Sequence, residues 1–191
     1  DPGQVVSQQP ALPPGAEQSS SYDLNKFRTG ADANKYVECR VVATGNSVDG
    51  VWEQLLRGYK RPNMKLFTGS VQTGCGPATT DVGPFYCPAD RKVYLDTAFF
   101  RELSQRFGAP GDFAAAYVIA HEVGHHVQNL LGISEKVQAA RERAGEREAN
   151  ALSVRLELQA DCLAGVWAKN ADAARGILEA GDVDEALRAA A

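Results

Sequence analysis

Three residues in segment 113–132, FAAAYVIAHEVGHHVQNLLG, have the types and spacing of a metal site. His121 and His125 lie four residues apart, and on a helix this spacing places both imidazoles on one face, one turn apart. Glu122 follows the first histidine directly. This is the HExxH pattern, in which two histidines bind zinc and the glutamate is the general base of a hydrolysis reaction. His126 points roughly 100° away from His125, and we expect it to be a core or surface histidine.

A catalytic zinc site needs a third protein ligand. No histidine remains elsewhere in the chain, so a carboxylate or a cysteine must supply it. Segment 153–167, SVRLELQADCLAGVW, is apolar nearly all round when drawn as a helix, which predicts a buried helix. It nevertheless carries Glu157 and Asp161 on one face, and buried acidic groups need a cation or a hydrogen-bond partner.

We therefore assign Glu157 to the metal, and Asp161 to a hydrogen bond with the outer ring nitrogen of a ligand histidine, His121. Two alternatives stay open at this stage. Asp161 could be the ligand in place of Glu157, or Glu157 could form a salt bridge with a distant arginine.

Apolar spacing and helix-breaking residues predict the elements that position these groups. The expected helices are 30–44, then 47–59, ended by Pro62, then 97–107, 113–131 and 150–169, with a short one after Asp182. Asp112 is the expected N-cap and Gly132 the expected end of the motif helix, and Gly124 is expected to allow close backbone packing. The charged run 134–149 predicts a solvated helix or helical hairpin.

The strand-like segments are 65–68, 85–87 and 92–96. The Gly-rich stretch 69–83 is expected to be a loop.

The four cysteines, Cys39, Cys75, Cys87 and Cys162, form no CxxC pair, which argues against a zinc ribbon. Cys75 and Cys87 flank a short loop, and a disulfide there would contribute about 3 kcal/mol on the chain-entropy model. That interpretation favours an oxidising compartment, whereas the alternative is four buried thiols in a cytosolic protein. A second bridge between Cys39 and Cys162 follows only by elimination.

Composition places the chain among soluble globular proteins. The 191 residues carry a net charge of −4, which lacks the basic footprint of a nucleic-acid partner. Residues 1–21 are rich in Pro, Gln, Ser and Gly and predict a disordered linker, which leaves 22–191 as one domain. The longest apolar run, residues 113–120, is too short to span a bilayer. Because the chain starts at Asp1 rather than Met, we expect a processed product whose targeting segment lies upstream.

HExxH followed by a helix with ExxxD resembles the gluzincin class of zinc peptidases. Four segments are similar to the neutral zinc metallopeptidase family of bacteria: KLFTGSVQTGCG, VGPFYCPADRKVYLD, FGAPGDFAAAYVIAHEVGHHVQNLLGISEKV and EANALSVRLELQADCLAGVWA. They cover most of residues 50–170. The resemblance implies zinc on His121, His125 and Glu157, with Glu122 catalytic. It also implies an α+β zincin-like fold, mostly helical with a small sheet, and an extracytoplasmic domain often tethered to the membrane by a preceding segment.

The activity expected from this resemblance is hydrolysis of a peptide bond in a peptide or protein substrate. Tyr86 and Tyr94 are candidate donors to the developing oxyanion, and residues 93–96, VYLD, are a candidate edge strand for an extended substrate. Two rivals are a zinc-stabilised binding or scaffold module without turnover, and a zinc hydrolase acting on something other than peptides. Family members usually continue past GDVDEALRAA with a His-Gly-Thr-Ser stretch and a Trp-Phe pair that this chain lacks, which keeps the non-catalytic rival open.

Overall fold

The structure is a computed structural model that describes residues 29, 31–107 and 112–190. The predicted linker, residues 1–21, and the predicted domain start at residue 22 lie outside these residues. The expected capping side chain of Asp112 is also outside the description. Among the described residues, no helix combines the length and apolar character needed to cross a bilayer.

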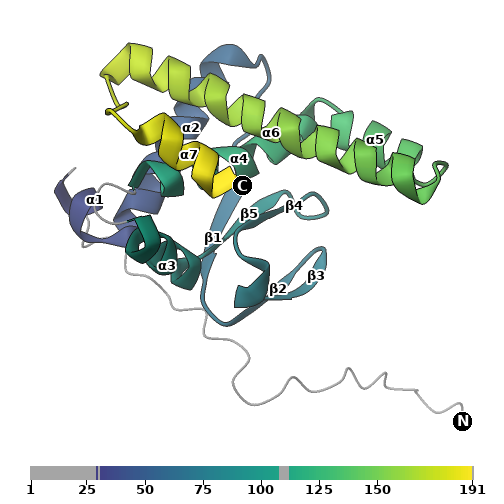
Figure 1. The fold of residues 1–191 in the computed structure, drawn as a ribbon, viewed down its shortest axis with the longest axis horizontal. Coiled ribbons are helices and arrows are strands. Elements are labelled where there is room, and N and C mark those ends of the chain that lie inside the picture. The colour runs from purple at the N-terminus through teal and green to yellow at the C-terminus, as the bar shows by residue number, and fades with distance from the viewer. Residues whose placement is uncertain (1–28, 30, 108–111, 191) are drawn as a thin grey trace, which may run out of the picture.

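Seven α-helices and five strands make up the described part of the chain, which confirms the α+β class, mostly helical with a small sheet. In chain order the elements are α1 (Ala31–Lys35), α2 (Val37–Leu55), β1 (Asn63–Phe67), β2 (Ser70–Thr73), β3 (Gly76–Thr79), the 3-10 helix η2 (Thr80–Val82), β4 (Phe85–Cys87), β5 (Lys92–Asp96), α3 (Thr97–Phe107), α4 (Asp112–Leu130), α5 (Ile133–Arg141), α6 (Glu146–Arg175) and α7 (Asp182–Ala190). Figure 1 shows α6 lying across one side of the molecule and the strands on the other, with α4 between them.

The three-stranded sheet has the order β1–β5–β4, with β5 parallel to β1 and antiparallel to β4. The expectation that residues 93–96 form an edge strand is therefore wrong, because β5 is hydrogen-bonded on both sides. Its last four residues are all buried, and burial on both faces is typical of a central strand. The edge strands of this sheet are β1 and β4, and Tyr86 of β4 pairs with Val93 of β5.

The Gly-rich stretch predicted to be a loop contains a β-hairpin, β2–β3. Thr73 stabilises its turn, since the Thr73 hydroxyl donates to the Gly76 carbonyl and accepts from the Cys75 amide. Strands of four residues rich in Gly, Pro and Thr carry little intrinsic signal, so the hairpin depends on contacts distant in sequence.

Two helices form in the region predicted as 30–44 and 47–59, but the boundary between them lies earlier in the chain. The break falls at Tyr36, and α2 then runs without interruption to Leu55, before Pro62 is reached. Gly45 does not end a helix. It is buried within α2, where an added Cβ would lie 2.6 Å from the Met64 sulfur. The glycine therefore permits close packing of α2 against β1.

Helix α4 is enclosed by α2, α6, α7, β4 and β5. Its apolar residues belong to the main core, where Phe113 stacks on Trp167 of α6. Ala120, Val123 and Val127 are each at most 1% exposed. Packing on nearly every side thus fixes the orientation of the HExxH helix.

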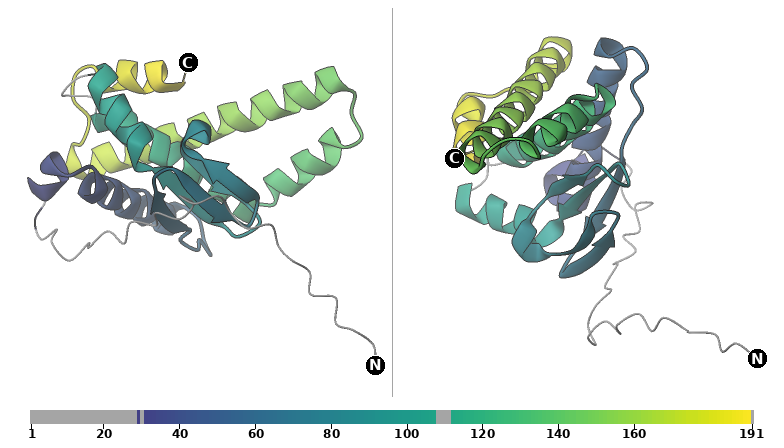
Figure 2. Two further views of the ribbon diagram at one scale, coloured as in Figure 1. Left: turned by 90° about the horizontal axis from the view of Figure 1, so that it is seen from below. Right: turned by 90° about the vertical axis from the view of Figure 1, so that its right-hand side faces the viewer.

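Helix α6 is longer than the predicted 150–169, and the prediction that it is buried all round is wrong. Its buried residues are Ala160, Ala164, Trp167 and Ala171, which form one stripe. Val154 and Leu158 on the outer side are 56% and 60% exposed. The charged run 134–149 forms α5 and the first turn of α6, the helical hairpin that extends from the rest of the molecule in Figure 2.

Candidate metal centre

The two helices that carry the candidate ligands are in close contact at a glycine. A Cβ built on Gly124 of α4 would lie 3.0 Å from the Ala160 carbonyl oxygen of α6 and 3.3 Å from its Cα. His121 and His125 flank Gly124, while Glu157 and Asp161 flank Ala160 with the same spacing. The contact therefore brings both ligand pairs together across one helix crossing.

Three ligand atoms form a small triangle at this crossing. The Nε2 atoms of His121 and His125 are 3.1 Å apart, and each is 3.2 Å from Oε2 of Glu157. Tetrahedral zinc with bonds of about 2.0–2.1 Å places neighbouring ligand atoms roughly 3.3 Å apart. The triangle thus matches three corners of a zinc tetrahedron, and among the described residues this is the group of side chains able to hold a metal ion.

Asp161 fixes the tautomer of His121. Its Oδ1 lies 2.8 Å from His121 Nδ1, and an ionised carboxylate can only accept, so Nδ1 carries the proton. Oδ1 also accepts a hydrogen bond from the Tyr117 hydroxyl. Burial, then this hydrogen bond, raise the pKa of Tyr117, so the phenol stays a donor. Asp161 therefore lies on the outer side of the His121 ring, and Glu157 on the inner side.

Gln128 fixes the tautomer of His125 in the same way. Its Nε2 donates to the Leu156 carbonyl at 2.7 Å and to Gln159 Oε1 at 3.0 Å. The amide oxygen is thereby directed at His125 Nδ1, 2.9 Å away. Nδ1–H is again the donor, so Nε2 of His125 presents a lone pair.

The lone pairs on both Nε2 atoms and the Glu157 carboxylate converge within 3.2 Å. Three acceptors at this separation repel one another unless a cation lies between them. The donor set, two imidazoles and one carboxylate, is that of known catalytic zinc sites. The residues present therefore fit a zinc ion.

Glu122 lies beside the triangle and is 8% exposed. Burial, and next the negative charge of Glu157, raise the pKa of Glu122 to about 8, although a backbone hydrogen bond from Tyr86 opposes the shift. A buried carboxyl group beside a candidate metal centre is positioned to exchange a proton with a ligand in the cleft.

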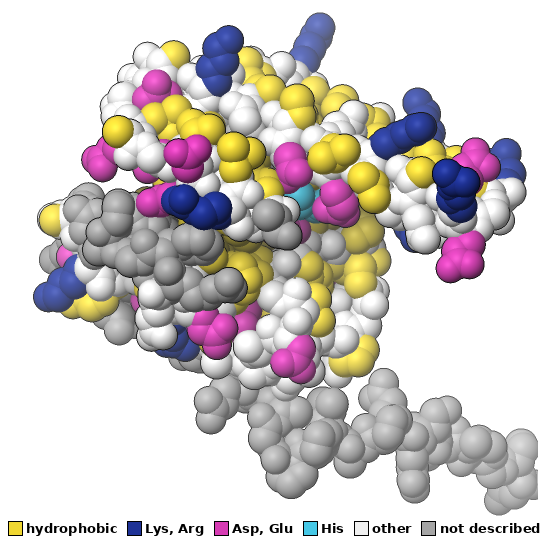
Figure 3. Space-filling model, viewed as in Figure 1, with side chains coloured by type: hydrophobic (Ala, Val, Ile, Leu, Met, Phe, Trp, Pro, Cys, Tyr) yellow, Lys and Arg dark blue, Asp and Glu magenta, His cyan; other side chains and the backbone are white. Residues whose placement is uncertain are grey.

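The triangle opens into a cleft of about 760 Å³. Its lining comes from β4 and the turn after it (Phe85, Tyr86, Pro88, Ala89), α4 (His121, Glu122, His125, Asn129), α5 (Ser134, Glu135, Gln138) and α6 (Leu156, Glu157). In Figure 3 a histidine (cyan) is visible between acidic side chains in the hollow below α6. A second, smaller opening reaches His121 and Glu122 from the side of α3 and α7.

Neither predicted oxyanion donor has a free hydroxyl in the cleft. Tyr86 lines it, but its hydroxyl accepts from Asn129 at 2.9 Å and lies 3.0 Å from His126 Nδ1. The other ring nitrogen of His126 donates to the Lys60 carbonyl at 2.6 Å, so Nδ1 must accept the Tyr86 proton. Tyr94 is 1% exposed in a separate core cluster and donates to Asp90.

Several partners of the site were not predicted from the sequence. Gln128 accepts a hydrogen bond from His125, and Tyr117 donates one to Asp161, the partner of His121. Each has a weak signal in the sequence. Gln128 lies three residues after His125, and Tyr117 four residues before His121, so each shares a helix face with the ring it contacts. His126 is 2% exposed, and burial lowers its pKa, as expected of a core histidine.

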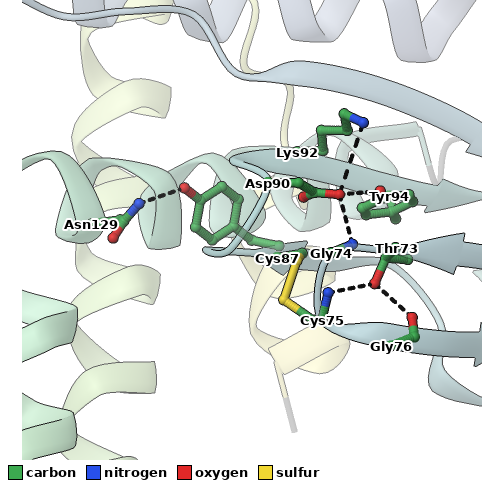
Figure 4. The surroundings of a disulfide bond; sticks show 10 residues. Thr73, Gly74, Cys75, Gly76, Cys87, Asp90, Lys92, Tyr94 and Asn129 are labelled. Carbon is green, nitrogen blue, oxygen red and sulfur yellow. Dashed lines mark hydrogen bonds and ion pairs between the residues drawn. A yellow bond between two sulfur atoms is a disulfide. The ribbon is translucent and has the colours of Figure 1, made fainter. Parts of the chain in front are cut away.

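The disulfide between Cys75 and Cys87 is confirmed. It joins the turn of the β2–β3 hairpin to the end of β4, next to Tyr86 and its partner Asn129 (Figure 4). The second bridge is wrong, since Cys39 is buried and Cys162 is exposed, and both are free thiols. The disulfide favours an oxidising, extracytoplasmic location.

Comparison with known proteins gives one family. The model described as "Putative neutral zinc metallopeptidase" matches residues 1–191. The uncharacterized protein Rv2575 of Mycobacterium tuberculosis is 53% identical over 201 residues, which cover 100% of this chain and 67% of that protein. The uncharacterized protein YpfJ of Escherichia coli is 46% identical over 159 residues, covering 83% of this chain and 55% of that protein. No solved structure matches this chain.

Proposed function

This chain belongs to the neutral zinc metallopeptidase family, and on that premise we propose that it hydrolyses peptide bonds with zinc held by His121, His125 and Glu157. One observation carries the proposal. A buried carboxyl group, Glu122, lies in the same cleft as the three converging ligand atoms. Hydrogen bonds to Asp161 and Gln128 already set the tautomers of the two ligand histidines.

Glu122 would act as the general base. Zinc, when bound, would supply a Lewis acid that polarises a water molecule and lowers its pKa towards about 7. Glu122 would accept a proton from the attacking water as the C–O bond forms at the peptide carbonyl carbon, and it would deliver a proton to the leaving amine nitrogen as the C–N bond breaks. The backbone hydrogen bond from Tyr86 restrains the Glu122 carboxylate during both transfers.

The edge strand β4 offers a place for the substrate backbone. It pairs with β5 on one side, and Phe85 and Tyr86 line the cleft. An extended peptide can add to such an edge through main-chain hydrogen bonds. The Cys75–Cys87 disulfide anchors this strand at its end, which keeps the edge at a fixed distance from α4.

The test compares the purified wild-type chain with the Glu122→Gln variant, both loaded with zinc, on a peptide library. Glu122→Gln should keep one zinc per chain and lose cleavage by about 10²- to 10⁴-fold, because only proton transfer is removed. Cleavage retained by the variant would contradict the base assignment. Absence of cleavage by the wild-type chain would contradict the peptidase proposal itself.

One observation favours the rival, a zinc-stabilised binding module. The Tyr86 proton is committed to His126 and Tyr94 lies elsewhere, so neither supplies an oxyanion donor. A binding module would hold zinc and bind peptides without turnover, and Glu122→Gln would then change neither property.

We also propose that the domain acts outside the cytoplasm, as the disulfide favours. An upstream membrane anchor stays a prediction. Fractionation of cells that express the full-length gene product would test both points.

A further inference from the structure

The end of the cleft formed by α5 carries an acidic side chain that the proposed mechanism does not use. Ser134, Glu135 and Gln138 of α5 line the cleft together. Glu135 and Gln138 are three residues apart and so share a helix face. Asn129 of α4 connects this wall to the metal centre, since it lies one turn beyond His125.

Among the residues that the structure describes, every charged side chain that lines the cleft is acidic. Glu157 contacts both ligand histidines, and Glu122 is buried beside them, so these two belong to the metal centre. Glu135 is exposed, and within the described part of the chain its carboxylate has no ion-pair or hydrogen-bond partner. Burial raises the pKa of Tyr86, and the positive charge of Arg91 opposes this shift from nearby, but Arg91 does not line the cleft.

We infer that Glu135 selects substrates with a basic side chain, Lys or Arg, on one side of the scissile bond. This inference rests on the proposed peptidase function and names its substrate class. Zinc, when bound, would offset the charge of Glu157, and Glu135 is the acidic side chain that the α5 wall contributes. An extended chain advances about 3.3 Å per residue, so the position of the basic residue that binds best reports how many residues separate Glu135 from the bond cleaved.

A simpler role for Glu135 is electrostatic, because an acidic residue in the first turn of a helix interacts favourably with the helix dipole. Glu148 provides the matched control. It is also an exposed glutamate in the first turn of its helix, α6, but it does not line the cleft. Changing either residue to glutamine removes the same charge from the same helical position.

The experiment measures binding rather than turnover, so that it does not depend on the catalytic step. Fluorescently labelled peptides of about eight Gly, Ala and Leu residues, with one Lys or one Glu scanned through every position, are titrated with the zinc-loaded Glu122→Gln chain. We expect about two- to fivefold tighter binding of the Lys peptide at one or two positions. Raised salt should weaken this preference.

Adding Glu135→Gln should abolish the preference, Glu135→Lys should reverse it, and Glu148→Gln should leave it intact. Equal binding of the Lys and Glu peptides, or a preference that survives Glu135→Gln, would overturn the inference. Cleavage of the same peptides by the wild-type chain is scored separately. A chain that cleaves without charge preference refutes only the role of Glu135, whereas one that binds with preference but never cleaves refutes the peptidase proposal.

Discussion

Gly124 lies so close to Ala160 that a single added methyl group would meet the Ala160 carbonyl oxygen at 3.0 Å. The neighbour is helix backbone rather than the end of a flexible side chain, so the two helices would have to separate. The ligands flank this contact on both helices. Helix separation therefore bears directly on the zinc triangle, whose atoms are now 3.1–3.2 Å apart.

We predict that Gly124→Ala weakens zinc binding and lowers the free energy of unfolding by about 1–3 kcal/mol through overpacking. Gly165→Ala is the control, because a Cβ at Gly165 of α6 would meet nothing within 4 Å. That variant should gain up to about 1 kcal/mol from helix propensity and keep its zinc affinity. Denaturant unfolding and competition with a zinc chelator measure both quantities. Equal zinc affinities of the two variants would contradict the role of the crossing.

Gln128 should prove important for zinc affinity although it is no ligand. Gln128→Met retains the volume but removes the acceptor for His125 Nδ1–H. We expect an affinity loss of about 10- to 100-fold, the usual cost of losing a partner that orients a ligand histidine. Gln159→Ala removes one acceptor from Gln128 yet leaves the His125 contact in place, so its affinity should stay close to wild type. Chelator competition on the three proteins gives the comparison.

Reduction of the disulfide should destabilise the chain. Cys75 and Cys87 are 12 residues apart, and closing a loop of this size contributes about 3 kcal/mol on the chain-entropy model. Urea unfolding with and without reductant measures the loss, which a Cys75→Ser/Cys87→Ser variant should reproduce. Cys162→Ser, at an exposed free thiol, should unfold like wild type and keep the same response to reductant.

The Asp49–Tyr59 pair gives a pH prediction away from the metal centre. Burial raises the pKa of Asp49, and the Tyr59 hydroxyl, which donates to its Oδ1 at 2.7 Å, partly opposes the shift. The folded chain thus holds its Asp49 proton at pH values where the unfolded chain, with a pKa of about 3.9, has released it. Stability contributed by this group therefore falls as pH rises above about 4.

Asp49→Asn removes that titration, so its stability relative to wild type should increase between about pH 4 and pH 7. Tyr59→Phe should steepen the fall, since it removes the opposing hydrogen bond. Urea unfolding across this range tests both variants, and a difference that does not change with pH would show that Asp49 ionises normally in the folded chain.

How far the sequence predicts the site depends on how local each signal is. His121, Glu122 and His125 follow from helical spacing alone. The prediction of Glu157 depends on the rule that a buried helix should not hold unpaired acids, yet α6 is open on the side of Val154 and Leu158. Glu157 nevertheless lies at the triangle, because Glu157 and Asp161 flank Ala160, where α6 meets α4.

The remaining features depend on contacts between segments distant in sequence. The position of β5 at the centre of the sheet is set by pairing with β1 and β4, which strand propensity does not encode. The β2–β3 hairpin lies in a sequence that favours loops and is linked to β4 by the disulfide. Glycine often interrupts helices, but Gly45 lies within α2, where the lack of a side chain leaves room for Met64.

The most direct test is a crystal structure of the zinc-loaded chain with diffraction data collected at the zinc absorption edge. We predict one anomalous peak per chain, about 2.0–2.2 Å from Nε2 of His121, Nε2 of His125 and a carboxylate oxygen of Glu157. A zinc ion coordinated by Asp161 instead of Glu157, or no anomalous peak between the two imidazoles, would contradict the account.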